Sequence, residues 1–211
     1  MRHKDTALLC RGTARSRTGL HLVIAAVAAV TASMMFIPAA LAHGRTVRRR
    51  GCADSHTLIA HASRARLQRT VVCLINQQRR MRGLPGLREN QRLNRSAQGW
   101  TNVMVNDRDF SHGADFSARI SAVGFDWSTA GENIATGYRT PVAVVKAWMA
   151  STGHCQNILN PDYRYVGTGV SNRSIAGFST LAGTWTQDFG LLMGQSDPSR
   201  NWGPAEGCPY T

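Results

Sequence analysis

Apolar residues recur at helical spacing in the part of the chain that follows residue 60. A first helix is predicted because one of its faces carries Leu67, Val71, Leu74 and Ile75, with arginine and glutamine elsewhere. The glycine- and proline-containing segment 83–86 ends it. A second helix is predicted after Asn90, which is a good helix cap. Its apolar residues return at steps of four, three and four: Leu93, Ala97, Trp100 and Met104.

Two shorter helices are predicted further along the chain. Asp115 is placed to cap the first of them, which closes at Gly124. Its apolar side consists of Phe116, Ile120 and Val123. Thr140 and Pro141 open the second, and Gly153 follows its end. Its buried side consists of Val144, Val145, Trp148 and Met149. We expect Trp100, Trp148 and Trp185 to be core residues.

The pattern changes after residue 160. Val166, Thr168 and Val170 alternate with other residues, and residues 184–189 form a β-branched and aromatic run. Both patterns are typical of antiparallel strands. Helices early and strands late, without regular alternation, predict an α+β domain whose helices cover a small sheet.

The first 42 residues have the layout of a secretory signal peptide. Five basic residues precede an apolar run from Leu20 to Ile37, and Ala40-Leu41-Ala42 offers a small-residue cleavage site. We therefore expect cleavage after Ala42 and a secreted, extracellular protein with no membrane span in its mature form. An uncleaved membrane anchor is the alternative, because the run approaches the ~20 residues of a spanning helix.

Charge divides the mature chain into two halves. The 211 residues carry 25 Lys and Arg against 12 Asp and Glu. Thirteen arginines and two acids lie in residues 43–95, whereas residues 96–211 hold seven basic residues and nine acids. We interpret residues 43–65, with Arg48-Arg49-Arg50, as a solvated basic arm. The alternative is salt-sensitive attraction to extracellular anionic polymers or lipid headgroups. Specific nucleic-acid binding is not expected, because no recognition motif is present.

Cysteine usage fits an oxidising compartment. Cys10 lies in the predicted signal peptide, which leaves Cys52, Cys73, Cys155 and Cys208. An even number in an exported chain predicts disulfides, with three possible pairings. The first two cysteines flank one local segment and the last two flank the other half, so we predict Cys52–Cys73 and Cys155–Cys208. The second bridge would tie a C-terminal tail, residues 196–211, to a domain spanning residues 66–195.

Three segments carry reactive side chains next to glycines or predicted helix ends, where side chains are often exposed. They are 110–112 (Phe-Ser-His), 131–134 (Gly-Glu-Asn-Ile) and 153–159 (Gly-His-Cys-Gln-Asn-Ile-Leu). We expect these segments at element edges, where rigid scaffolds carry functional sites. His112, His154 and Glu132 could hold a divalent cation with an open position for water. Taken singly, each histidine could instead be a hydrogen-bonded structural residue, and Glu132 an acceptor of backbone N–H groups.

The order of these segments resembles the CAP superfamily, also called the SCP-like or pathogenesis-related-1-like domain, and especially its small bacterial secreted branch. The resemblance covers about residues 70–190. It rests on residues 74–79 (Leu-Ile-Asn-Gln-Gln-Arg) with Gly83-Leu84-Pro85 behind them, 110–112, 131–135, 147–149 (Ala-Trp-Met), 151–159 and 185–190 (Trp-Thr-Gln-Asp-Phe-Gly).

The resemblance implies an α-β-α sandwich, with a three-stranded antiparallel sheet between helical layers and a surface cleft that holds two histidines and two acids. His112, Glu132 and His154 match three of these cleft positions. Asp115 is the candidate for the second acid, although its pattern also predicts a helix cap. In some relatives the histidines bind zinc. The resemblance therefore implies His112 and His154 as possible Zn²⁺ ligands, with Glu132 supporting a ligand or acting as a base.

The sequence offers no clear nucleophile. No Gly-x-Ser-x-Gly elbow occurs, and Ser111 and His112 are neighbours whose side chains point in opposite directions on an extended segment. We therefore expect a secreted protein that acts by binding through the His/Glu cleft, with a divalent metal, a lipid or a protein as partner. A metal-dependent hydrolase that uses the same cleft is the alternative. Sterol or fatty-acid carriage is a third possibility, by family analogy alone.

Overall fold

The computed structural model describes residues 51–195 and 207–209. The predicted signal peptide, the Arg48-Arg49-Arg50 run and most of the predicted C-terminal tail lie outside the described residues. The chain divides into two units, Met1–Val47 and Arg48–Thr211, and the description below concerns the second. Within the described residues, no helix combines the length and apolar character that crossing a membrane requires.

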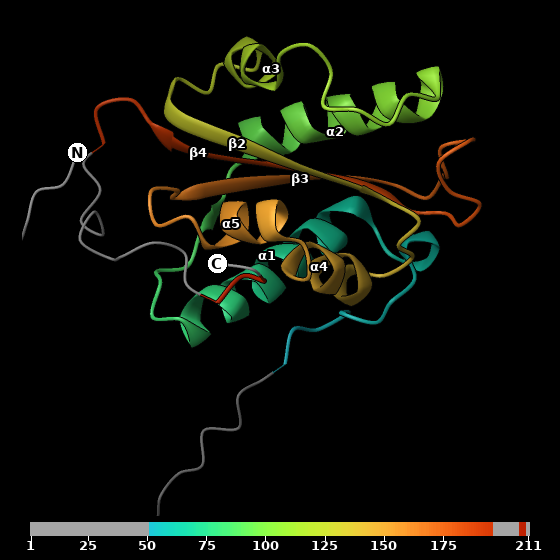
Figure 1. Cartoon of the computed structure of the whole chain (residues 1–211), viewed down its shortest axis with the longest axis horizontal. Coiled ribbons are helices and arrows are strands. Elements are labelled where there is room, and N and C mark those ends of the chain that lie inside the picture. The colour runs from blue at the N-terminus through green and yellow to red at the C-terminus, as the bar shows by residue number, and fades with distance from the viewer. Residues whose placement is uncertain (1–50, 196–206, 210–211) are drawn as a thin grey trace, which may run out of the picture. The chain divides into compact units, whose positions relative to one another are not determined.

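A four-stranded sheet lies between two layers of helices (Figure 1). In spatial order its strands are β1 (Arg88–Glu89), β3 (Tyr165–Ser171), β4 (Thr184–Leu192) and β2 (Trp127–Thr136). One face is covered by α2 (Gln91–Asp107) and α3 (Phe116–Ala122). The other face is covered by α1 (Arg64–Met81), α4 (Pro141–Met149) and α5 (Thr152–Leu159). The predicted α+β class and the implied sandwich are confirmed.

The sheet differs from the implied three antiparallel strands. The pairs β2–β4 and β3–β4 are antiparallel as expected, but β1 adds a fourth strand that runs parallel to β3. The added strand consists of only Arg88 and Glu89. Two residues are too few to produce an alternating pattern, so the sequence could not reveal this strand.

The predicted helix caps are present. The Asn90 side chain accepts hydrogen bonds from the backbone N–H groups of Arg92 and Leu93 at the start of α2. Thr140 accepts one from Ala143 at the start of α4. Residues 152–159, however, form helix α5 rather than a loop. Glycine at the second helical position obscured this helix in the sequence, because glycine lowers helix propensity.

Residues that precede α1 belong to the folded unit. A short 3-10 helix, η1 (Ile59–His61), buries Ile59 in the main core. The predicted disulfide Cys52–Cys73 fastens the same segment to α1, and the predicted bridge Cys155–Cys208 is also formed. The described part of the expected basic arm is therefore packed against the domain from residue 52 onward.

Close contact between α2 and the sheet depends on two glycines of β3. A Cβ atom on Gly167 would collide with the backbone between Leu93 and Asn94, and one on Gly169 would collide with Ala97. Helix α2 can therefore lie directly on β3. This brings polar side chains of α2 to the sheet and to its outer edge.

Candidate functional site

Glu132 lies in the middle of β2 rather than at the edge of an element, where we expected it. Strand β2 forms the edge of the sheet opposite β1. Successive side chains of a strand point to opposite faces, so Glu132 faces α2 and α3 whereas Asn133 faces α5. The motif Gly131-Glu132-Asn133 therefore presents polar groups to both helical layers at the edge of the sheet.

The carboxylate of Glu132 is bound by an imidazole and by a guanidinium group. The Glu132 side chain is only 1% exposed. His112 Nδ1 lies 2.8 Å from Glu132 Oε1, and Arg119 Nη2 lies 2.6 Å from Oε2. A buried carboxylate is stable when it is paired and hydrogen-bonded in this way. The imidazole of His112 remains 49% exposed, and so the pair joins a buried acid to an accessible base.

Arg119 organises this half of the site, a role that no pattern in the sequence indicated. Its guanidinium lies 3.8 Å from the ring centroid of Trp100, a cation–π distance. It also donates a hydrogen bond of 3.0 Å to the carbonyl oxygen of His112, and Trp100 Nε1 donates one to Ser111. Trp100, expected only as a core residue, is therefore the platform on which Arg119 lies.

His154 reaches the same edge from the other layer. It lies on α5, where its carbonyl oxygen accepts a hydrogen bond of 3.2 Å from Asn133 Nδ2. Asn157, one turn later, donates to the carbonyl of Glu132 at 3.1 Å and to Asn133 Oδ1 at 2.9 Å. Burial and the nearby His112 lower the pKa of His154. The structure therefore brings His112, Glu132 and His154 together, and we call these three residues the His–Glu site.

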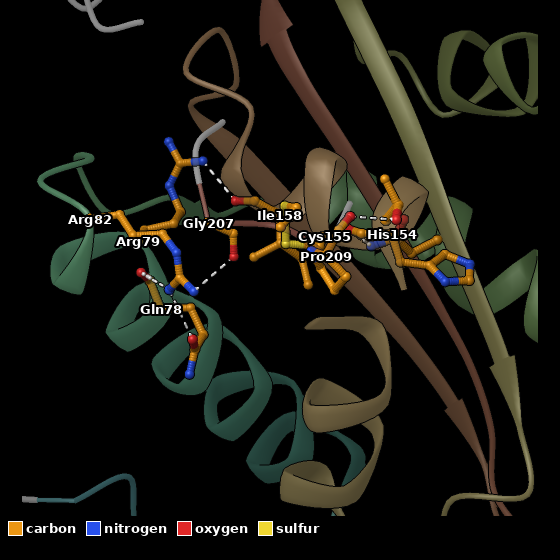
Figure 2. The surroundings of a disulfide bond; sticks show 11 residues. Gln78, Arg79, Arg82, His154, Cys155, Ile158, Gly207 and Pro209 are labelled. Atoms are coloured by element: carbon orange, nitrogen blue, oxygen red, sulfur yellow. Dashed lines mark hydrogen bonds between the residues drawn. A yellow bond between two sulfur atoms is a disulfide. The ribbon is translucent and has the colours of Figure 1, made fainter. Parts of the chain in front are cut away.

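The position of α5 is fixed from behind by the C-terminal segment and by α1 (Figure 2). Cys155 is bonded to Cys208, and Thr152 donates a hydrogen bond of 2.7 Å to Pro209. At the far end of α5, the buried guanidinium of Arg79 donates to the carbonyls of Ile158 and Asn160 at 2.8 Å each. The imidazole of His154 points away from the disulfide, toward β2 (Figure 2).

Asp115 caps α3, as its sequence pattern predicted. Its Oδ1 accepts hydrogen bonds from the Ser117 and Ala118 backbone and from the Ser117 hydroxyl. The Ser117 hydroxyl, ahead of the backbone N–H of Ala118, lowers the pKa of Asp115. One oxygen of this exposed side chain is thus committed to the helix.

Asp188 is a buried acid that the sequence analysis did not single out. It is the cross-strand partner of Glu132 and is 1% exposed. Neither of its carboxyl oxygens makes a hydrogen bond of ordinary geometry among the described residues, although Ser96 and Glu132 lie close enough to affect its titration. Burial, and secondarily the charge of Glu132, raise the pKa of Asp188 well above its usual value. The sequence did contain a sign of this residue, because Asp188 is an acid within the β-branched and aromatic run 184–189.

The donor set for a metal consists of two imidazoles. Among residues 51–195 and 207–209, no group of three or more His, Cys, Asp or Glu side chains is arranged to hold a metal ion. The contact of His112 Nδ1 with Glu132 leaves Nε2 as the outward nitrogen. Metal-binding histidines commonly have their second nitrogen held by a carboxylate in this way. His112 and His154 are thus the two residues of the site that could serve as metal ligands.

The fold and the His–Glu site define a CAP domain. Residues 72–189 match the Cysteine-rich secretory protein (CAP) family, and the chain belongs to this family. Over 139 residues it is 38% identical to YkwD of Bacillus subtilis (strain 168), covering 63% of this chain and 50% of YkwD. Over 110 residues it is 32% identical to the membrane protein YlbC of the same organism, covering 50% of this chain and 32% of YlbC.

A solved structure agrees with this assignment. An extracellular SCP-domain protein from Bacillus anthracis is 25% identical, with a TM-score of 0.53, over 61% of this chain and 44% of its own. The chain spans about half or less of the length of these three relatives. The similarity therefore concerns the CAP domain and does not extend to the activities of the longer proteins.

Proposed function

We propose that this CAP-domain protein is secreted and acts by binding a ligand at the His–Glu site. The observation that carries the proposal is the 2.8 Å contact between His112 and the buried Glu132, which orients an accessible imidazole toward solvent beside His154. The two disulfides and the extracellular origin of the Bacillus anthracis structure support secretion.

The ligand that best suits this site is a divalent cation, with Zn²⁺ as the first candidate. Zinc accepts neutral imidazole nitrogens and leaves open positions for water. Because the pKa of His154 is lowered, its ring stays neutral at pH 7 and needs no deprotonation before binding. The buried Glu132 carboxylate orients the His112 ring. Bound Zn²⁺ would supply Lewis acidity to any further ligand that it held.

Calorimetric titration with Zn²⁺ at about pH 7.5 tests the proposal. The variant His112→Ala/His154→Ala should lose the stoichiometric binding that the wild type shows, because both imidazoles are removed. The matched control His56→Ala/His61→Ala removes two exposed histidines away from the site and should bind as the wild type does. Binding should weaken as the pH falls below about 6.5, where imidazoles become protonated. Equal binding by both double variants would refute the proposal.

A metal-dependent hydrolase is the second candidate, favoured by the exposed imidazole that a buried carboxylate orients. Such a pair can act as a general base. A fluorogenic panel of esters, peptides and nucleic acids, with and without Zn²⁺, should show turnover that disappears in Glu132→Gln. Activity that persists in this variant, or that is absent from the wild type, would exclude hydrolysis at this site.

Lipid carriage is favoured by a separate observation. A groove of about 400 Å³ lies between α1 and α4, with Leu74, Val142, Val145 and Met149 among its lining residues and Lys146 beside them. An acyl chain could occupy such an apolar groove with its carboxylate near the Lys146 ammonium. Native mass spectrometry of the purified protein should then detect copurifying fatty acid, and Val145→Glu should abolish it. Protein free of lipid after mild extraction would count against carriage.

A further inference from the structure

Side-chain amides rather than another strand cover the outer edge of β3 beyond its short pairing with β1. The N–H and C=O of Thr168 bond to Asn94 Oδ1 and Gln68 Nε2, each at 2.8 Å. The N–H and C=O of Val170 bond to Gln98 Oε1 at 3.0 Å and to Gln98 Nε2 at 3.2 Å. An open strand edge pairs readily with other chains, and these amides prevent that. They also form a fixed polar floor.

A groove of about 390 Å³ lies over this floor, between the N-terminal part of α1 and α2. Its lining consists of Arg64, Gln68, Gln91, Asn94, Arg95, Gln98, Gly99 and Asn102. It contains two guanidinium groups and five amides but no acidic and no apolar side chain. We call it the Arg–amide groove. It lies on the β3 side of the sheet, whereas the His–Glu site lies at the β2 edge.

The two arginines of the groove contribute nothing evident to the fold. Both are exposed, and neither guanidinium group has a hydrogen-bond or ion-pair partner among the residues that the structure describes. Arg64 is the first residue of α1, and no acid lies in that first turn. A cation at a helix N-terminus is unfavourable, because it lies at the positive end of the helix dipole. A ligand anion would provide the missing partner.

Gly99 leaves space in the Arg–amide groove that a ligand could occupy. It lies inside α2, is exposed, and has nothing within 4 Å of the position a Cβ atom would take. Glycine within a helix is less stable than alanine, because it loses more backbone entropy on folding. Packing therefore does not require this glycine. Its effect is to keep one wall of the Arg–amide groove free of a side chain.

We propose that the Arg–amide groove binds an anionic glycan, a sugar chain that bears carboxylate or phosphate groups. Guanidinium groups recognise both anions through paired hydrogen bonds. Amides both donate and accept, as sugar hydroxyls do, and Gln91 and the Nδ2 group of Asn102 are free to meet them among the described residues. A lipid tail or an apolar peptide would find no apolar side chain in this lining.

The full secreted chain is titrated with hexagalacturonate, with a poly(glycerol phosphate) oligomer and with neutral maltohexaose. We expect one or both anionic probes to bind, which identifies the anion, and the neutral probe not to bind. Arg64→Gln/Arg95→Gln should weaken binding at least tenfold, about 1.4 kcal/mol. The control Arg69→Gln/Arg80→Gln removes the same charge from exposed positions of α1 outside the groove and should change the affinity less than twofold.

Obstructing the groove gives a second measurement that does not alter charge. Gly99→Gln should weaken binding of the anionic probe severalfold, whereas Gly99→Ala should bind as the wild type does, and both should fold because the position is open. Equal losses in the two double arginine variants would show nonspecific attraction and overturn the proposal, as would unimpaired binding by Gly99→Gln. Zinc binding by Arg64→Gln/Arg95→Gln should remain unchanged, which separates this test from that of the His–Glu site.

Discussion

The two faces of the sheet differ in chemistry although the same strands form both. The face toward α1, α4 and α5 buries a continuous apolar core that includes Trp148, Trp185 and Phe189. The face toward α2 and α3 has two small apolar clusters and, between them, buried polar groups. Among these, Thr101 bonds to Thr186 across the interface at 2.9 Å, and the acids Glu132 and Asp188 lie side by side.

The two faces therefore contribute differently to the domain: the apolar face provides most of its stability, and the other face carries its buried polar groups. Apolar burial stabilises a fold by roughly 25 cal/mol per Å², so the α1, α4 and α5 face holds the domain together. The disulfide Cys155–Cys208 reinforces that face. The α2 and α3 face can therefore include a buried carboxyl that lacks good hydrogen bonds. Glu132 and its partners His112 and Arg119 lie on this face, and His154 approaches the same edge from α5.

The largest expected effect comes from the apolar face. Trp185→Ala should lower the free energy of unfolding by about 4 kcal/mol, because a fully buried indole leaves a large cavity and Tyr138 loses a hydrogen-bond donor. Trp127→Ala, at a half-buried ring whose Nε1 bonds to Ser121, should cost about 1 kcal/mol. Urea denaturation measures both. Equal losses would contradict the division between the two faces.

An intermediate effect is expected at Arg79, the one arginine fully buried among the described residues. Burial, and secondarily Arg164, lower its pKa to about 10, so it stays charged at pH 7. Arg79→Met should cost about 3 kcal/mol, because the carbonyls of Pro85, Ile158 and Asn160 lose their donor. Arg80→Met, the same change at an exposed neighbour, should be nearly neutral in urea denaturation. Comparable losses would show that the buried hydrogen bonds do not hold α5.

An effect of opposite sign is expected at Asp188. Its raised pKa means that the folded protein keeps a proton which the unfolded chain releases above about pH 4. The carboxyl therefore destabilises the fold increasingly as the pH rises through that window. Asp188→Asn should raise the melting temperature at pH 8 and leave it nearly unchanged at pH 4.

Asp115→Asn provides the matched control for this pH dependence. The pKa of Asp115 is lowered, so its contribution is present above the unfolded pKa and is lost as the pH falls through the folded pKa. Removing its charge should therefore lower stability slightly at neutral pH. Thermal melts from pH 2 to pH 8 compare the two variants: the difference caused by Asp115→Asn should shrink below about pH 4, and the difference caused by Asp188→Asn should grow above it. Differences that change within the same pH window would contradict the assigned environments.

The sequence predicted those parts of the fold that depend on neighbouring residues. Asn90, Asp115 and Thr140 cap helices as expected, since a cap bonds to N–H groups two or three residues away. Strands β3 and β4 followed from alternation and β-branched runs. Strand β2 and helix α5 were missed because they contain Gly131 and Gly153, and glycine usually indicates a turn or a loop.

The candidate site was predicted only in part. His112, Glu132 and His154 were selected from three segments with reactive side chains and then matched to cleft positions of the family, and the structure places them together. Arg119, Trp100 and Asp188 were not selected, because what they touch lies on other elements. Asp188 is 56 positions from Glu132 in sequence, yet the register of β2 against β4 sets them opposite each other.

The amino-acid sequence by itself determined the order of most elements, the helix caps, the two disulfide pairs and the family. The caps and the order of elements rest on contacts within a few residues or on the composition of single segments, whereas the disulfide pairs followed from the positions of four cysteines along the chain and the family from the order of its motifs. Only the tertiary structure decided which polar groups meet: Glu132 with His112, Arg119 and Asp188, and the β3 edge with three amides. These contacts depend on the register of the strands and on the packing of α2 against Gly167 and Gly169. Register and packing are both set by many contacts between residues that are far apart in sequence.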